Sequence, residues 1–250
     1  MRFKVLTYNI HKCIGGVDRR CRPERVIETI EHYEPDVVLL QEVDDRVPRS
    51  RRERQIDVIG DALGLEHRAF QPNVKLKLGV YGNAILSRWP LKDVDDVELT
   101  IWPKKRRRAQ VAALAIEPHR VQHGPRHRDY RPIAIANLHL GLADFERRRQ
   151  LRRLLESPAF VRLEPSAAAI IGGDFNDVYH NLGLAALADH AFSPVLGNAK
   201  TFPAALPLRC LDGIYYRGPL KVDRGFVGHT KLAKQASDHL PAIAEFKYRG

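Results

Sequence analysis

One short stretch of the chain combines the pattern of a buried strand with an abrupt change to polar residues. Its sequence is Ala167-Ala168-Ala169-Ile170-Ile171-Gly172-Gly173-Asp174-Phe175-Asn176-Asp177. The apolar run is too short for a stable helix and ends at two glycines, which indicates a strand followed by a tight turn or a close backbone approach. Asp174 and Asn176 share one side of the chain if it stays extended. Such a pair can orient a water molecule and hydrogen-bond the group that the water attacks. A strand that ends in an Asx-turn is the alternative interpretation.

Other clusters of polar residues follow predicted strands elsewhere in the chain. They are Thr7-Tyr8-Asn9-Ile10-His11, Leu40-Gln41-Glu42-Val43, Asn137-Leu138-His139-Leu140, Leu211-Asp212-Gly213-Ile214 and Ser237-Asp238-His239-Leu240-Pro241. Taken singly, each cluster also fits a turn or a hydrogen-bonded core residue. In this order, the set resembles the endonuclease/exonuclease/phosphatase superfamily, which includes DNase I-like and exonuclease III-like nucleases. The resemblance runs from Asn9 to His239, nearly the whole chain, and is strongest to the small bacterial members.

The resemblance implies an α+β fold, a four-layer sandwich of two packed, mixed β-sheets flanked by helices. The order of predicted strands and helices is compatible with this architecture. Because strands early, middle and late in the chain all supply candidate site residues, we predict one catalytic domain over residues 1–250. The clearest predicted elements are a helix from Pro23, a buried strand over Asp36–Gln41, a helix over Gln55–Leu63 stopped by Gly64, and an Arg-rich helix over Asp144–Glu156. The last helix places Phe145, Leu151, Leu154 and Leu155 on its apolar side, with its arginines facing solvent.

The chemistry implied by the resemblance needs a divalent metal ion. Phosphodiester hydrolysis requires an activated water, stabilised phosphoryl oxygens and a leaving oxygen, and a hard cation with oxygen ligands supports the last two. The resemblance implies that Glu42 is the main metal ligand, with Asn9 and Asp238 close by, and that Mg²⁺ or Mn²⁺ is the cofactor. No Cys/His cluster in the sequence has the spacing of a zinc site.

The resemblance also assigns roles to catalytic residues. Asp174 would polarise the attacking water, and Asn176 would hold that water or a phosphate oxygen. His239 would contact the scissile phosphate, with Asp212 orienting its ring and keeping it cationic. A carboxylate partner favours imidazolium, which stabilises developing negative charge. His139 matches the second histidine of the family, and a satisfied core histidine is the alternative.

Three further residues match positions that reach phosphate in relatives: Tyr81, Asn83 and Arg108. A structural tyrosine and a turn asparagine explain the first two nearly as well. Arg108 is preceded by the basic run Lys104–Arg107, and any member of that run could make the phosphate contact instead.

The charge of the chain favours an anionic substrate. The sequence contains 41 lysine and arginine residues against 30 acids, a formal net charge of +11, which attracts polyanions. We therefore expect a metal-dependent phosphodiesterase, with a nuclease acting on DNA or RNA as the leading form. The alternatives are a phosphodiesterase or phosphatase acting on phospholipid head groups or small phosphoesters, and a catalytically silent nucleic-acid-binding module. A dedicated abasic-site nuclease is disfavoured, because such enzymes carry a lysine soon after the glutamate, where this chain has Val43-Asp44-Asp45.

Basic runs could extend the contact with a polyanion, although such runs are usually solvated surface. They occur at Arg49–Arg54, Lys104–Arg108, Arg126–Arg131 and Arg147–Arg153. An anionic lipid surface is a second expected type of partner. No apolar run approaches the ~20 residues that span a bilayer, and the N-terminus lacks a signal-peptide pattern. Together with three cysteines that lack metal spacing, these features lead us to expect free thiols, a cytoplasmic location and a monomer.

Overall fold

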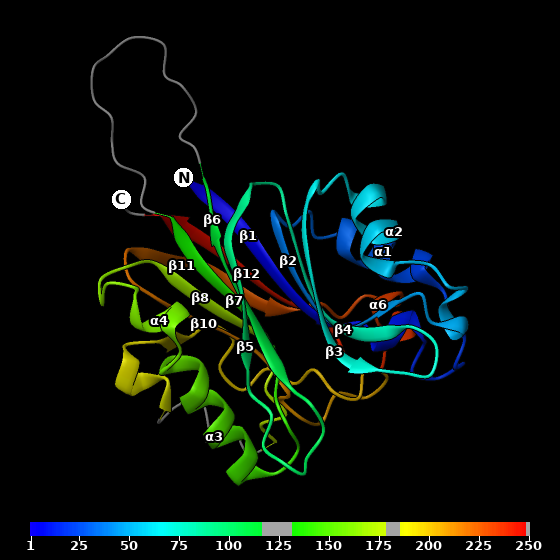
Figure 1. The fold of residues 1–250 in the computed structure, drawn as a ribbon. Helices are drawn as coiled ribbons and strands as arrows, with labels where there is room; N and C mark the ends of the chain where they lie inside the picture. The colour runs from blue at the N-terminus through cyan, green and yellow to red at the C-terminus, as the bar shows by residue number, and fades with distance from the viewer. Residues whose placement is uncertain (117–131, 179–185, 249–250) are drawn as a thin grey trace.

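Two six-stranded mixed β-sheets pack against each other in this computed structural model, which describes residues 1–116, 132–178 and 186–248 (Figure 1). In spatial order the first sheet contains β11 (Leu220–Val227), β12 (Ala242–Tyr248), β1 (Arg2–Asn9), β2 (Val37–Asp45), β4 (Val80–Ser87) and β3 (His67–Lys75). The second contains β5 (Leu91–Glu98), β6 (Arg108–Leu114), β7 (Ile133–His139), β8 (Ala169–Asp174), β10 (Asp212–Arg217) and β9 (Ser193–Pro194).

Helices cover the outer faces of both sheets, so the expected four-layer sandwich is confirmed (Figure 1). The α-helices are α1 (Pro23–Glu31), α2 (Gln55–Leu63), α3 (Asp144–Leu155), α4 (Pro158–Val161) and α6 (Ala233–Ala236), and the 3₁₀ turns are η1 (His11–Cys13), η2 (Pro48–Ser50) and η3 (Ala188–His190). The first two pack on the first sheet, and α3 and α4 pack on the second. No helix in the described part of the chain is long and apolar enough to cross a membrane. The basic run Arg126–Arg131 lies outside the described residues.

Local sequence signals explain several element boundaries. Helix α1 begins at Pro23, and α2 covers the predicted range and ends at Gly64, whose φ of +64° forms a left-handed cap. The predicted strand over Asp36–Gln41 continues further, to Asp45 in β2, because a β-bulge lies inside it. At the bulge Glu42 adopts a φ of +58°, and a bulge of this kind redirects a side chain relative to its neighbours.

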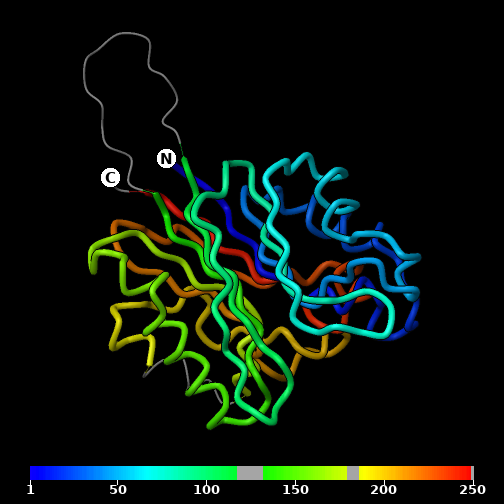
Figure 2. Tube along the Cα trace, in the orientation of Figure 1, coloured from blue at the N-terminus to red at the C-terminus, as the bar shows by residue number. Residues whose placement is uncertain are grey.

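Strand register brings the polar strand ends together. In the second sheet His139 pairs with Asp174, which in turn pairs with Asp212 on its other side. In the first sheet Asn9 pairs with Gln41. Paired residues on adjacent strands point to the same face, so each group forms a row across its sheet. Because β1 pairs antiparallel with β12, both termini lie at the opposite end of the sandwich from these rows (Figure 2).

The two sheets approach closely beside Asp174. A Cβ atom added at Gly172 would lie 2.6 Å from Leu39 Cδ1 of the first sheet. At Gly173, where φ is +150°, an added Cβ would lie 2.0 Å from the carbonyl oxygen of Leu138. The two glycines therefore satisfy the close approach that the sequence pattern predicts.

A pair of buried amides joins the sheets at the same place. Gln41 Nε2 donates to Asn137 Oδ1 at 2.8 Å and to Thr7 Oγ1 at 3.1 Å. Asn137 Nδ2 in turn donates to the carbonyl oxygens of Leu40 and Ala84, each at 2.9 Å. Buried polar groups of this kind are stable only when they are hydrogen-bonded, so the pair fixes the position of β7 against β2.

The buried face of α3 differs from the prediction. Leu151, Leu154 and Leu155 are buried, but Phe145 is 50% exposed and Arg147 is only 3% exposed. The reason is that α3 uses polar side chains to hold the segment after β7. Gln150 Oε1 accepts a hydrogen bond from the backbone of Gly141 at 2.8 Å, and Arg147 donates to the carbonyl of Leu142.

We expect Asn137→Ala to lower the free energy of unfolding by about 3 kcal/mol or more, because it removes the hydrogen bonds to Gln41, Leu40 and Ala84, its buried partners in the first sheet. Urea denaturation of the purified protein measures this change. Asn198→Ala at an exposed position is the matched control and should alter stability by less than about 0.5 kcal/mol. A loss for Asn137→Ala as small as that of the control would show that the amide pair does not hold the sheets.

Candidate active site

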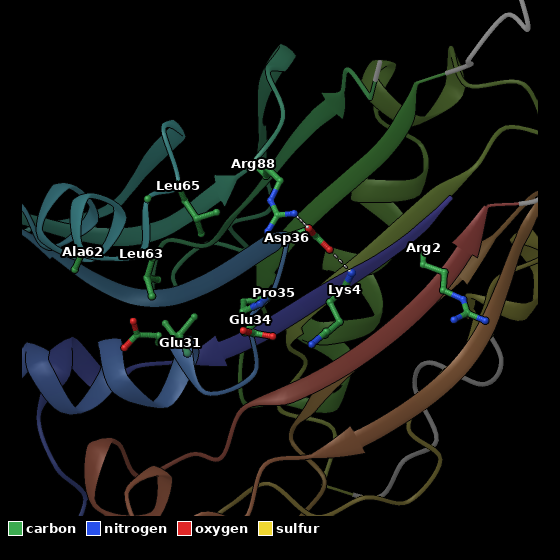
Figure 3. A pocket seen from close by; sticks show the side chains of 12 residues that line it. Arg2, Lys4, Glu31, Glu34, Pro35, Asp36, Ala62, Leu63, Leu65 and Arg88 are labelled. Atoms are coloured by element: carbon green, nitrogen blue, oxygen red, sulfur yellow. Dashed lines mark hydrogen bonds and ion pairs between the residues drawn. The ribbon is translucent and has the colours of Figure 1, made fainter. Parts of the chain in front are cut away.

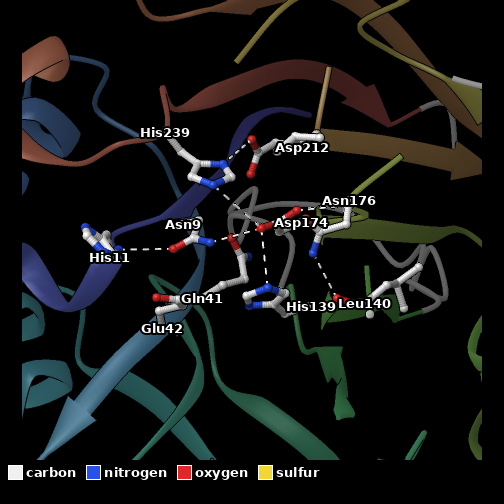
Figure 4. Close-up of polar contacts among 12 residues, drawn as sticks. Asn9, His11, Gln41, Glu42, His139, Leu140, Asp174, Asn176, Asp212 and His239 are labelled. Atoms are coloured by element: carbon white, nitrogen blue, oxygen red, sulfur yellow. Dashed lines mark hydrogen bonds and ion pairs between the residues drawn. The ribbon is translucent and has the colours of Figure 1, made fainter. Parts of the chain in front are cut away.

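Asp174 lies at the centre of the polar cluster (Figure 4). Its carboxylate is 1% exposed, and its Oδ2 accepts a hydrogen bond from Asn9 Nδ2 at 3.0 Å. The same Oδ2 lies 3.4 Å from His139 Nε2 and 3.8 Å from His239 Nε2. Its Oδ1 accepts from the backbone N–H of Asn176 at 3.0 Å, which is the Asx-turn. The Asx-turn interpretation of the opening stretch is confirmed, and the turn directs the Asp174 carboxylate into the cluster; its role toward a water stays a prediction.

The pKa of Asp174 is raised to about 6, chiefly by burial. The cationic ring of His239 opposes this rise, and the negative charge of Asp212 adds to it. At neutral pH the carboxylate is ionised and is still basic enough to accept a proton from water.

His239 carries the positive charge of the cluster. Its Nδ1 donates to Asp212 Oδ2 at 2.8 Å, and its ring packs against Phe202 with centroids 4.9 Å apart. Burial acts to lower the pKa of His239, but Asp212 and Asp174 outweigh it and raise that pKa to about 10. The ring is therefore protonated at neutral pH and directs Nε2–H toward the space beside Asp174.

His139 has the opposite protonation state. Burial lowers its pKa well below the usual value, and the nearby charge of Arg107 lowers it further. A neutral histidine and a cationic histidine thus flank one carboxylate. Asn176 lies beside them, and its Nδ2 donates to the carbonyl of Leu140 at 2.9 Å.

The expected metal ligands gather around the turn η1. Glu42 forms an ion pair with Lys12. Burial acts to raise the pKa of Glu42, but Lys12 and then His11 outweigh it and lower that pKa, so the carboxylate is ionised. Asn9 Oδ1 accepts from the backbone N–H of His11 at 3.1 Å, and Asp238 Oδ1 lies 3.7 Å from His11 Nδ1. These oxygens fit Mg²⁺ or Mn²⁺, provided that the Lys12 ammonium leaves Glu42 when the ion binds.

A second group of potential ligands exists in the cluster itself. Ligand atoms of Asp174, Asp212 and His239 all lie within 4.8 Å of one another. However, a metal ion binds only neutral imidazole, and His239 is protonated and hydrogen-bonded to Asp212. The protonated ring of His239 therefore favours stabilisation of negative charge over ligation of a metal ion.

The three expected phosphate contacts lie in different surroundings. Tyr81 is 9% exposed, and several cations surround its ring. Asn83 is buried, and its Nδ2 donates to Gln71 Oε1 at 3.3 Å and to the carbonyl of Arg108 at 3.2 Å. The Arg108 side chain pairs with Glu98 at 3.1 Å and with Asp96 at 3.5 Å, on β5.

Arg107 is the buried member of the basic run Lys104–Arg108. The residue is 7% exposed, burial lowers its pKa, and the negative charges of Asp174 and Glu42 oppose that shift. Its buried Nε has no hydrogen-bond partner. Consecutive residues of an extended chain point in opposite directions, so Arg107 faces the site while Arg108 faces β5. From the sequence, any member of the basic run could make the phosphate contact. The direction of each side chain depends on the register of the segment in the sheet.

The sequence analysis assigned no role to Lys12 or Asn137, and it left Arg107 as one of several candidates for the phosphate contact. Lys12 directly follows the Asn9-Ile10-His11 segment, and Asn137 begins a cluster that had been singled out for His139. Both residues therefore lie in or next to segments that the sequence analysis had already selected. Their contacts with Glu42 and Gln41 depend on residues far away in the chain.

A separate cavity of about 550 Å³ lies beside the outer helices and contains none of the predicted site residues (Figure 3). Its central carboxylate, Asp36, accepts from the backbone N–H of Lys4 at 2.8 Å and pairs with Arg88 at 2.9 Å. Because Asp36 already has these partners, the cavity is a weaker candidate for an active site than the cluster around Asp174.

Comparisons with known proteins identify the family of the chain. Residues 6–239 match the model of the Endonuclease/Exonuclease/phosphatase family. The chain belongs to this family. It is 28% identical to uncharacterized protein YbhP of Escherichia coli K12 over 97% of this chain and 95% of the relative.

Two solved structures show the same fold. An endonuclease/exonuclease/phosphatase from Beutenbergia cavernae gives a TM-score of 0.77 at 19% identity and covers 100% of this chain and 72% of its own. The mannosyl-6-phosphatase Bt3783 of Bacteroides thetaiotaomicron gives a TM-score of 0.73 at 16% identity, over 98% of this chain and 100% of its own. A protein named as a mannosyl-6-phosphatase thus shares this fold.

The two histidines should give opposite dependences of stability on pH. His239 has a raised pKa, so its contribution is complete below its unfolded pKa near 6.5 and is lost as pH rises toward about 10. We expect the stability difference between wild type and His239→Asn to shrink over that range in urea unfolding with EDTA. His139 has a lowered pKa, so wild type should lose stability relative to His139→Asn as the pH falls below 6.5. A pH-independent difference for His239→Asn would contradict its cationic state.

Proposed function

We propose that the chain is a divalent-metal-dependent hydrolase of phosphoesters and that its leading substrate is a phosphodiester of DNA or RNA. The observation that carries this proposal is one basic carboxylate, Asp174, placed between a cationic and a neutral histidine. This arrangement supports activation of a water beside a group that stabilises negative charge. We treat residues 1–250 as one catalytic domain, because both sheets contribute to the cluster.

In this mechanism Asp174 accepts the proton of the attacking water, and Asn176 positions that water or a phosphoryl oxygen. His239 donates Nε2–H to a phosphoryl oxygen as its charge grows, while Asp212 keeps the ring protonated and oriented. Asn9 holds Asp174 Oδ2 in place. A Mg²⁺ or Mn²⁺ ion held by Glu42, with Asn9 and Asp238, would supply positive charge to the phosphoryl group.

The net charge of +11 favours nucleic acid over uncharged or small substrates. The structural similarity to a mannosyl-6-phosphatase favours the second candidate, hydrolysis of small phosphoesters. A silent binding module is the weakest candidate, because an ionised, desolvated carboxylate is costly unless it serves a function.

Hydrolysis assays test the proposed reaction. We expect wild type to cleave bis-p-nitrophenyl phosphate and plasmid DNA with Mg²⁺ or Mn²⁺, and to lose this activity in EDTA. Asp174→Asn preserves the shape of the side chain but removes the base, so kcat should fall about a thousandfold or more. Asn198→Ala should retain full activity.

Assays with different substrates distinguish the two candidate activities. Plasmid and RNA cleavage suppressed by salt would support the nuclease, whereas turnover of mannose 6-phosphate or a phospholipid alone would replace it with the second candidate. If Asp174→Asn were as active as wild type, the reaction would have to occur elsewhere in the molecule.

A further inference from the structure

A group of cations surrounds Tyr81 on the Glu42 side of the candidate site. The Nζ atoms of Lys12 and Lys105 lie 5.6 Å and 5.1 Å from the centroid of the Tyr81 ring, and Arg49 Cζ lies 5.5 Å from it. These residues come from η1, η2 and the segment between β5 and β6, which are far apart in the sequence. Figure 4 shows Glu42 apart from Asp212 and His239, on the side of His11.

Buried polar residues hold two of these cations in position. Arg49 Nε and Nη2 bind the two carboxylate oxygens of Asp44 at 2.8 Å and 2.7 Å, and the Asp44 side chain is fully buried. Asp44 is also the strand partner of Tyr81. The fully buried Gln55 donates from Nε2 to the carbonyl of Lys12 at 2.8 Å. The Arg49 side chain and the backbone of Lys12 are thus preorganised, whereas Lys105 is exposed.

Arg107 adds an independent sign that an anion binds here. Arg107 is buried, its Nε has no hydrogen-bond partner, and Glu42 is among the acids that act on its charge. A buried, unsatisfied donor on a charged group is costly, so a ligand that accepts from it would restore the missing hydrogen bond.

Ion pairs neutralise only part of the positive charge near Tyr81. Lys12 pairs with Glu42 and Arg49 pairs with Asp44, while the acids that act on Arg107 are Asp174, Glu42 and Glu146. A metal ion at Glu42 would add further positive charge and release the Lys12 ammonium. His239 already provides a cation for the phosphate that reacts. Lys105 at the Tyr81 ring and the unpartnered Nε of Arg107 are therefore available to a separate anionic group.

We propose that Lys12, Arg49, Lys105 and Arg107 around Tyr81 form a subsite for a second phosphate group of the substrate. The inference rests on the proposed hydrolase function and narrows it to phosphoesters that carry another phosphate near the bond that is cleaved. Guanidinium and ammonium groups both bind phosphate oxygens with charge-assisted hydrogen bonds. The second phosphate comes either from the next linkage of a polynucleotide or from a terminal phosphomonoester.

Short oligonucleotide substrates distinguish a neighbouring linkage from a terminal phosphomonoester as the source of the second phosphate. The probes are thymidylyl-thymidine, the same dinucleotide with a 5′ or a 3′ terminal phosphate, and the trinucleotide without terminal phosphates. We expect kcat/KM for at least one probe with a second phosphate to exceed that for the plain dinucleotide by about tenfold or more. A preference for a terminally phosphorylated dinucleotide assigns the subsite to a phosphomonoester, and a preference for the trinucleotide assigns it to a neighbouring linkage.

Two adjacent exposed lysines provide matched variants. Lys105→Gln removes a cation at the Tyr81 ring and should lower the selectivity ratio about fivefold to tenfold. Lys104→Gln makes the same charge change one residue away and should leave the ratio unchanged, because Lys104 is not among the cations found at that ring. Equal selectivity ratios in wild type, Lys105→Gln and Lys104→Gln would overturn the subsite.

Binding tests the subsite without turnover. Calorimetric titration of the Asp174→Asn protein should show tighter binding of a phosphorylated dinucleotide or the trinucleotide than of the plain dinucleotide. Lys105→Gln in that background should reduce the difference. Selective binding without hydrolysis by wild type would retain the subsite and reject the hydrolase. Hydrolysis without selective binding would retain the hydrolase and reject the subsite.

Discussion

The burial of one carboxylate at the junction of two sheets is the constraint on which the rest of the structure depends. Asp174 is almost fully removed from water, and its partners Asn9 and His139 come from different sheets. A buried charge must be hydrogen-bonded or matched by opposite charge. The close sheet approach at Gly172 and the amide pair Gln41–Asn137 provide the fixed geometry that makes this possible.

Burial and neighbouring charges also give chemically similar groups different pKa values. His139 and His239 flank one carboxylate, but only His239 has a buried acid, Asp212, on its other ring nitrogen. One histidine is therefore cationic and the other neutral. Glu42 stays ionised because cations surround it, whereas the pKa of Asp174 rises because burial dominates. The surroundings of each side chain thus give residues of the same type different protonation states or pKa shifts.

Much of the fold was predictable because its signals are local. The Pro23 start of α1, the Gly64 end of α2 and the buried strands follow from short patterns. The bulge at Glu42 was not predictable in this way, since it depends on the pairing of β2 with β4. Similarly, α3 buries Arg147 in place of Phe145 because the segment after β7 needs hydrogen bonds.

The sequence by itself determined the family, the sandwich architecture and which strand ends carry reactive side chains, because motif order and strand patterns are properties of the chain. Only the tertiary structure decided which residues meet. It turned Arg107, and not Arg108, toward the site, and it placed Lys12 on Glu42. The physical reason is that register and burial arise from contacts between distant segments, so they set side-chain direction and protonation state where the local sequence contains no such information.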